Sequence, residues 1–337
     1  MSKILVVGDH KTGTGPANVT KEYIDHLADR ARCLKASSKA GRLAELFLKI
    51  PFSSVVFCSG YSAQNIIAAK IAHFFKIKCA YLMHGSVAHE NRINLCEDQH
   101  MNRVEYETLK ICDKVFAVSH RFAAWLKKRY PEFESKIDVL VNGVDADILN
   151  EAGGSAKSRE RKRNMIFSIG GGMPRKRINR ICEAMELLRK EDGYGDLELV
   201  VTGDKGAFSE IISGYDFVKD LGIVGRKEIQ KLLNEAGLFI QNSCFETFAL
   251  APMEALSCGC DILLSMEIGA LELFDLKGNR ELSQYIIKDC EDPVEIKDKI
   301  KVSLGSGNAA LFLKAFDKDG ATWETRTEQL VQKLKSL

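Results

Sequence analysis

Short apolar runs recur along the first half of the chain, and each is followed by a Gly, Ser, His or Asn. Stretches with apolar residues at helical spacing lie between them. Strand-length runs that alternate with helices are typical of β-α-β units, whose strands form a parallel sheet. The sequence therefore predicts a doubly wound α/β domain with strands at Ile4–Val7, Val55–Phe57, Ala80–Met83, Val115–Val118 and Val139–Val141.

The same alternation restarts after Asn142 and Gly143. It predicts strands at Met165–Ile169, Leu197–Thr202, Leu238–Gln241 and Ile262–Leu264, and helices such as Ile178–Arg189 and Lys227–Ala236. Residues 153–163, between the two series, are small, polar and basic, which is typical of an exposed linker. We therefore expect a first domain over residues 1–152, a linker over 153–163 and a second domain over 164–322.

Length and composition agree with two domains. At 337 residues the chain has room for about two domains of ordinary size. Its 45% hydrophobic and 28% charged residues are the proportions of a soluble globular protein, and no apolar run is long enough to cross a bilayer. A predicted strand from Ile4 leaves no room for a secretory leader after Met1, so we expect a cytoplasmic protein. The 10 cysteines include no Cys-x-x-Cys pair, and we expect reduced, buried thiols.

The segment Ser243–Gly259 carries the strongest chemical signal. It follows the predicted strand Leu238–Gln241, and Pro252 suits the first turn of a helix. Glu246 then lies in a loop at the carboxyl end of a strand, and Glu254 begins a helix nearby. In open α/β sheets this end of the strands binds ligands, and helix N-termini there favour phosphates. Because carboxylates accept hydrogen bonds from sugar hydroxyls, the pair predicts a nucleotide-sugar site.

This segment resembles the Glu-x7-Glu signature of retaining glycosyltransferases of the GT-B fold, in particular glycosyltransferase family 4. The resemblance implies an α/β fold of two Rossmann-like doubly wound domains that face a central cleft. It also implies that Glu246 lies by the donor sugar and that Glu254 holds the ribose. The backbone amides of Phe248, Ala249 and Leu250 are implied to bind the sugar and the phosphates.

The end of the chain fits the same fold. Apolar residues at helical spacing from Trp323 to Leu337 predict a terminal helix over residues 323–337. In GT-B enzymes such a helix crosses back onto the first domain. The resemblance therefore implies that this helix packs on the domain of residues 1–152.

A glycine-rich loop, Gly8–Asn18, follows the first predicted strand and leads into a helix. It is not a P-loop, because Thr14 stands where a Lys should follow Gly13, and Asn18 replaces the third Gly of the dinucleotide fingerprint. Its glycines still let the backbone approach a ligand closely. By resemblance the loop borders the donor phosphates, which makes Gly15 a donor-binding candidate; a turn that only needs glycine explains it equally well.

The second domain has a corresponding loop, Ile169–Arg177, which matches the family's Gly-rich loop with a Lys. When the sugar-phosphate bond breaks, negative charge accumulates on the diphosphate, and a fixed cation in a water-poor site stabilises it. We assign this role to Lys176, with Gly171 and Arg175 as further donor-binding residues. Many family members carry an Arg where this chain has Gly171, so the choice between Arg175 and Arg177 as the partner of Lys176 stays open.

His84 stands at the carboxyl end of a predicted strand in the first domain, within Tyr81–Ser86. Imidazole can donate a hydrogen bond to a sugar hydroxyl or carry a proton near neutral pH. Family 4 enzymes often have a His there, close to the reacting sugar. His84 is therefore a catalytic candidate beside Lys176 and Glu246, and a buried structural His is the alternative.

Asp145 and Asp147 spell the metal-binding pair of another large transferase fold, but they follow a turn into the linker. The resemblance implies that Lys and helix dipoles supply the positive charge instead. We therefore expect no metal and no cofactor, and a nucleotide sugar as the donor substrate, with UDP-sugar favoured over GDP-sugar. The implied reaction is front-face transfer with retention at the anomeric carbon, in which Glu246 positions sugar hydroxyls.

The acceptor leaves a weaker signal. Arg121–Tyr130 is a basic stretch with aromatics, and Phe47, Phe74 and Phe75 lie near lysines. Such segments can rest on anionic membranes, which would suit a lipid-linked glycan and a place at the inner face of the plasma membrane. The alternative is a core helix with a solvated basic face. The expected partners are a nucleotide sugar and a glycan or lipid-linked acceptor; the net charge of +2 argues against nucleic acid.

The leading function is a retaining hexosyltransferase of surface polysaccharide or glycoconjugate synthesis. One alternative is another sugar enzyme of the same fold, a phosphorylase or a sugar-nucleotide epimerase. The other is a non-catalytic glycosyltransferase-like partner subunit, although the presence of Lys176, Glu246 and Glu254 speaks against it.

Overall fold

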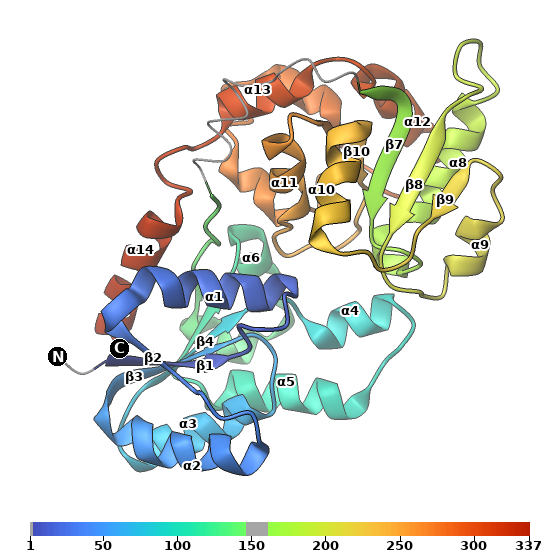
Figure 1. Cartoon of the computed structure of the whole chain (residues 1–337). Coiled ribbons are helices and arrows are strands. Elements are labelled where there is room, and N and C mark those ends of the chain that lie inside the picture. The colour runs from blue at the N-terminus through green and yellow to red at the C-terminus, as the bar shows by residue number, and fades with distance from the viewer. Residues whose placement is uncertain (1–2, 146–160) are drawn as a thin grey trace. The chain divides into compact units, whose positions relative to one another are not determined.

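The computed structural model describes residues 3–145 and 161–337. The chain divides into two compact units (Figure 1). Unit 1 comprises Met1–Asn91, Glu97–Val144 and Asp319–Leu337, and unit 2 comprises Arg92–Cys96 and Asp145–Lys318. Residues 153–160 of the predicted linker lie outside the described residues, whereas Lys162 and Arg163 already belong to the first strand of unit 2.

Unit 1 is built on a six-stranded sheet in the order β2-β1-β3-β4-β5-β6, and all its strand pairs are parallel. The central strands are buried on both faces, as the apolar runs predict. The strand order reverses between β1 and β3, which makes this gap the switch point of the sheet. The strands are β1 Lys3–Gly8, β2 Ala31–Cys33, β3 Ser53–Ser59, β4 Cys79–Met83, β5 Lys114–Ala117 and β6 Ile137–Val139.

Helices cover both faces of this sheet, with α1 and α14 on one side and α2, α3 and α5 on the other (Figure 1). Helix α14 packs on α1, where the rings of Trp323 and Tyr23 meet edge to face with centroids 5.4 Å apart. The helices are α1 Gly15–Leu27, α2 Lys39–Lys49, α3 Gln64–Phe74, α4 Val87–Ile93, α5 Gln99–Ile111, α6 His120–Arg129 and α14 Trp323–Lys335, with 3-10 turns η1 Ala28–Arg30, η2 Ile50–Phe52 and η3 Pro131–Lys136.

Unit 2 repeats the design with a second parallel six-stranded sheet, in the order β12-β11-β10-β7-β8-β9. The order reverses between β7 and β10, so the switch point of this sheet lies between those strands. The strands are β7 Lys162–Ile169, β8 Glu198–Thr202, β9 Val218–Asp220, β10 Ala236–Gln241, β11 Asp261–Ser265 and β12 Ile286–Ile287. The helices are α8 Ile178–Leu188, α9 Ser209–Ser213, α10 Arg226–Glu235, α11 Ala251–Ser257, α12 Pro293–Ser303 and α13 Asn308–Ala315, with 3-10 turns η4 Pro174–Lys176, η5 Gly269–Leu273 and η6 Arg280–Tyr285.

Two further observations concern membranes. Over residues 3–145 and 161–337, no helix has both the length and the apolar character needed to cross a bilayer. The basic stretch Arg121–Tyr130 forms α6 and its end. Its aromatic residues Phe122 and Tyr130 are buried, whereas Trp125 is partly exposed.

Candidate functional site

The glycine-rich loop after β7 is fixed to the end of β8. The amides of Gly170 and Gly171 both donate to the carbonyl oxygen of Thr202, at 2.7 and 2.9 Å, and the amide of Gly172 donates to the carbonyl of Asp204 at 3.0 Å. Gly171 has a φ of +55°, and a Cβ atom there would lie 2.1 Å from the carbonyl oxygen of Asp204. Only glycine fits this position, so the chain passes close to its neighbour and then enters η4.

We expect the substitution Gly171→Ala to destabilise unit 2 by about 1–3 kcal/mol, because it combines a steric clash with a left-handed backbone. Gly15, the first residue of α1 in unit 1, is the matched control: it also follows a strand and a loop, and a Cβ atom there meets nothing within 4 Å. Thermal unfolding of both variants checks this. Equal melting temperatures would contradict the close packing at Gly171.

Three charged side chains meet where β7 and β10 lie side by side. Lys176 Nζ lies 2.5 Å from Glu246 Oε2, and Arg175 Nη1 lies 3.0 Å from the same oxygen. Gln241 Nε2 donates to this oxygen as well, at 3.1 Å. The three charged side chains are only 11–15% exposed. The structure thus brings together three of the residues that the sequence singled out, at the switch point of the sheet, where open α/β sheets bind ligands.

The two cations control the charge of Glu246. Burial by itself raises the pKa of this carboxyl, but the charges of Lys176 and Arg175, and their hydrogen bonds, outweigh burial and lower the pKa to about 2. Glu246 is therefore ionised throughout the neutral range. Glu246 thus shares its charge between two cations, and an anionic ligand placed beside Lys176 and Arg175 would be stabilised by both.

The loop that carries Glu246 is held by the segment after β11. The amide of Gly269 donates to the Glu246 carbonyl at 3.0 Å, and the amide of Ala270 donates to the Phe248 carbonyl at 2.8 Å. Phe248 is buried, whereas Ala249 and Leu250 are partly exposed. Ala249 has a φ of +80°, which a non-glycine residue rarely adopts. The loop therefore holds a strained and fixed course up to the start of α11.

Glu254 lies in the first turn of α11 and is half-buried. Burial raises the pKa of its carboxyl, and the charge of Arg226, at the start of α10, opposes this rise. A half-buried carboxylate in the first turn of a helix is placed to accept hydrogen bonds from hydroxyl groups.

The other cations of the loop have different partners. Arg177 and Arg180 both pair with Glu291, and for Arg180 Nε the distance to Glu291 Oε2 is 3.0 Å. Arg175 therefore shares Glu246 with Lys176, and Arg177 does not. The sequence left this choice open, because Glu291 is far away in the chain. It also gave no signal for Gln241, whose side chain completes the shell around Glu246.

His84 in unit 1 follows β4 and ends a chain of buried hydroxyl groups. Its Nε2 lies 3.0 Å from Ser59 Oγ, which lies 2.7 Å from Thr20 Oγ1. Thr20 donates its own proton to the carbonyl oxygen of Pro16 at 2.8 Å. Ser59 then donates to Thr20, and His84 donates to Ser59, so Nε2 carries the ring proton. Ser59 is the last residue of β3, next to the switch point of this sheet. Ser59 was not among the residues named from the sequence, although it lies just after the predicted strand Val55–Phe57, at the end of a strand where ligands bind.

Burial lowers the pKa of His84 to about 4. The imidazole is therefore neutral at pH 7. As an uncharged donor and acceptor, His84 can still orient a hydroxyl group.

This pKa predicts an acid-dependent loss of stability. Between pH 6.5 and 4 the unfolded chain takes up a proton on His84 that the folded chain refuses, so stability falls as the pH falls through this window. We expect His84→Asn to flatten the fall in melting temperature over this range. Parallel melting curves for the native chain and the variant, measured from pH 7 down to 4, would show that His84 is not buried as described.

The described residues show no metal cluster: among residues 3–145 and 161–337, no three His, Cys, Asp or Glu side chains are placed to bind an ion together. Asp147, the second member of the Asp145 pair, lies outside the described residues.

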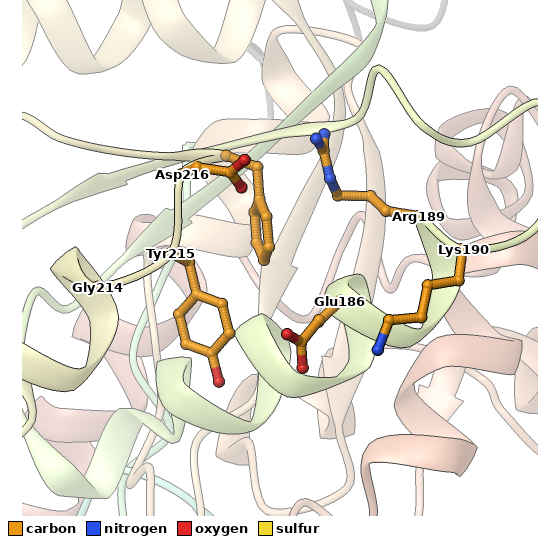
Figure 2. A pocket seen from close by; sticks show the side chains of 7 residues that line it. Glu186, Arg189, Lys190, Gly214, Tyr215 and Asp216 are labelled. Atoms are coloured by element: carbon orange, nitrogen blue, oxygen red, sulfur yellow. The ribbon is translucent and has the colours of Figure 1, made fainter.

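A separate cavity of ≈ 350 Å³ lies between the end of α8 and the loop before β9 (Figure 2). It is lined by Glu186, Arg189, Lys190, Gly214, Tyr215, Asp216 and Phe217. These residues lie at the end of α8 or just before β9, on the side of the sheet where the strands begin. Lys176 lies on the other side, where the strands end. It is not part of the cluster around Glu246.

Comparison with profiles of known families identifies the family of this chain. The profile described as "Glycosyl transferases group 1" matches residues 155–310, and the profile described as "Glycosyltransferase Family 4" matches residues 9–148. The chain belongs to the group 1 glycosyltransferases of family 4. The resemblance seen in the sequence is thereby confirmed, and the matched residues include the Gly-rich loop, Lys176, Glu246 and Glu254. A sequence search of curated proteins found no match.

Solved glycosyltransferase structures share the whole fold. Anabaena Alr3699/HepE in complex with UDP superposes with a TM-score of 0.68 at 14% identity, over 99% of this chain and 100% of that chain. The UDP-forming α,α-trehalose-phosphate synthase of Burkholderia xenovorans, in complex with glucose-6-phosphate, gives 0.69 at 10% identity over 99% and 100%. A mutant of S. aureus TarM in complex with UDP gives 0.64 at 16%, over 87% of this chain and 59% of that chain. At these identities the likeness concerns the fold, which is GT-B.

Proposed function

We propose that this glycosyltransferase is a retaining enzyme that moves a hexose-type sugar from a nucleoside diphosphate donor to a glycan acceptor. The observation that carries the proposal is the cluster of Lys176 and Arg175 on Glu246, where the strand order of unit 2 reverses. A site with two cations, one carboxylate and closely approaching backbone suits a ligand that combines a diphosphate with a sugar.

In this proposal the donor diphosphate lies beside Lys176 and Arg175, in addition to Glu246. Lys176 and Arg175 now donate to Glu246, and the charge that develops on the leaving diphosphate gives both cations a second anion. Gly171 lets the backbone approach the phosphates, and the amides of Phe248, Ala249 and Leu250 donate to the sugar and phosphate oxygens. Glu246 keeps the cations in place and accepts from the sugar hydroxyls. No covalent intermediate on Glu246 is proposed.

The remaining candidates receive orienting roles. Glu254 accepts hydrogen bonds from the ribose hydroxyls, for which its position in the first turn of α11 is suited. His84, as a neutral imidazole, donates to or accepts from a hydroxyl of the transferred sugar. Gly15 lies at the exposed start of α1, where the amides of a helix N-terminus favour phosphate. No step of this reaction calls for a metal or a cofactor.

UDP is the proposed nucleotide of the donor. The proposal is supported by HepE and TarM, which have the same fold and were solved with UDP. We assign the acceptor to unit 1, by the family's division of labour, and the pathway to surface polysaccharide or glycoconjugate synthesis at the cytoplasmic side of the membrane.

Thermal unfolding with UDP, GDP, ADP and their sugar conjugates tests the donor site. Because a ligand at a hundred times its Kd stabilises the native state by about 2.7 kcal/mol, we expect a selective rise in melting temperature with UDP and one UDP-sugar. Glu254→Ala should weaken UDP binding by about tenfold, the effect of one lost charged hydrogen bond. No shift with any nucleotide would contradict the donor site and favour a non-catalytic subunit.

Product analysis separates the enzymatic alternatives. We expect UDP release that depends on a glycan acceptor, and a product whose anomeric configuration by NMR is that of the donor sugar. Dependence on inorganic phosphate would identify a phosphorylase, and a free epimer without acceptor would identify an epimerase. An inverted product would contradict the retaining mechanism.

A further inference from the structure

Unit 1 carries a group of exposed apolar side chains on three neighbouring elements. Helix α2, the turn η2 and helix α3 contact one another, and α2 and α3 lie on the same side of the sheet (Figure 1). Leu48, Phe52 and Phe74 have relative exposures of 70%, 69% and 78%. We call this surface the α2–α3 patch, which consists of Leu43, Phe47, Leu48, Phe52, Ile67 and Phe74.

The apolar face of α2 is wider than the part of the helix that packs on unit 1, so some of its apolar side chains stay exposed. Leu46 is fully buried against unit 1, and Leu43 and Phe47, one helical turn apart, extend this apolar face outward. Leu48 lies further round the helix and is exposed. On α3, Ile67 and Phe74 are two turns apart on one exposed face. Grouped exposed side chains of this size mark an interaction surface, whereas single ones do not.

Three exposed cations stand among the apolar residues of the patch. Lys39 and Arg42 lie in the first turn of α2, and Lys70 lies between Ile67 and Phe74 on α3. All three cations are exposed, and among the described residues none of them pairs with a carboxylate. Glu45, the one acidic residue of α2, already binds Lys49 Nζ at 2.7 Å and the backbone amide of Lys35 at 2.7 Å. The patch therefore presents apolar side chains within a positive field.

We propose that the α2–α3 patch docks unit 1 onto an anionic lipid surface. Apolar side chains on a helix that lies flat enter the boundary between headgroups and acyl chains, and adjacent Lys and Arg residues bind the anionic headgroups. The long stems of Lys and Arg cover apolar surface while their charges reach the phosphates. A protein partner would need matching acidic residues, whereas a negatively charged membrane provides both properties at once. This inference does not depend on the donor nucleotide or on catalysis.

Sedimentation of the full chain with vesicles tests the docking surface. We expect binding to phosphatidylcholine vesicles that contain about one third phosphatidylglycerol to be at least tenfold tighter than to phosphatidylcholine alone. The double variant Leu48→Glu/Phe74→Glu should lose this binding, because it places charge in the apolar part of the patch. Lys39→Gln/Lys70→Gln should weaken binding to the anionic vesicles and leave the weak binding to the neutral ones unchanged.

The matched control is Val294→Glu/Val302→Glu on α12 of unit 2, where the two side chains are 53% and 47% exposed. It makes the same change of charge at exposed apolar positions and should bind vesicles as the native chain does. All variants should keep the native response to UDP in thermal unfolding, which separates this test from that of the donor site. A native chain that stays in the supernatant, or a patch variant that binds like the control, would overturn the proposal.

A second copy of the chain is the competing occupant. Light scattering without lipid measures the molar mass of the native chain and of Leu48→Glu/Phe74→Glu. We expect both to be monomers. A native dimer that the patch substitutions dissociate would assign the patch to self-association and overturn the lipid proposal.

Discussion

Replacing Lys176 with Ala is expected to lower kcat by about 10²–10³-fold, the effect of removing one preorganised group that stabilises developing charge. The affinity for UDP should change much less, because the cation acts most strongly on the charge that appears as the sugar leaves. The fold should survive the change, since Glu246 keeps Arg175 at 3.0 Å as its ionic partner. Steady-state rates and UDP binding, measured side by side, give the two numbers.

Arg177→Ala is the control for this substitution. Arg177 follows Lys176 in the same loop, but it pairs with Glu291 and not with Glu246. We expect this variant to keep kcat within about threefold, because Arg177 belongs to a partly exposed ion pair that does not contact Glu246. Lys176→Arg should recover part of the lost rate. A fully active Lys176→Ala variant would remove the residue from the reaction.

The second large effect is expected for Glu246→Gln. The substitution keeps the shape of the side chain but removes the carboxylate charge that Lys176 and Arg175 share. Removing one partner of a buried ion pair costs about 3–5 kcal/mol; because these side chains keep 11–15% exposure, we expect the lower end of that range. UDP should then raise the melting temperature more in the variant than in the native chain, because its diphosphate supplies the missing negative charge.

The pH dependence of this loss follows from the pKa of Glu246. The pKa is about 2 in the folded protein against 4.5 as the ordinary value, so the stability that its charge contributes is complete above pH 4.5 and is lost as the pH falls toward 2. The stability difference between the native chain and Glu246→Gln should shrink over that window. Glu183→Gln, at a partly exposed pair with Arg180 at 2.8 Å, is the control and should cost no more than about 1 kcal/mol. A Glu246→Gln variant as stable as this control would show that the carboxylate does not hold the two cations.

The interior of both sheets was predictable, and their edges were not. The predicted strands correspond to β1, β3, β4 and β5 in unit 1 and to β7, β8, β10 and β11 in unit 2. These strands are buried on both faces and read as continuous apolar runs. The short strands β2, β9 and β12 were missed, and all three lie at sheet edges. The edge strand β6 was predicted two residues late, as Val139–Val141 instead of Ile137–Val139. An edge strand is half covered and carries polar residues such as Arg32 and Lys219, so its apolar signal is weak.

The sequence by itself determined the fold, the family and the loops that hold the candidate site residues. Apolar runs, glycines and the Glu246 to Glu254 spacing are local properties, and each is visible within a few residues of the chain. Lys176 and Glu246 could be named as candidates because each lies in a loop after a predicted strand and matches a motif of the family that the sequence resembles. The carboxyl ends of parallel strands share one edge of a sheet.

The partners of these residues were decided only by the tertiary structure. Glu246 meets Lys176 and Arg175 because β10 pairs with β7, a contact between segments about 70 residues apart. Arg177 pairs with Glu291, which is also remote in the chain, and His84 is neutral because the fold partly buries its ring beside Ser59. Charge state, ion pairing and burial depend on the distances between segments that are remote in the chain. A pattern of neighbouring residues in the sequence does not specify those distances.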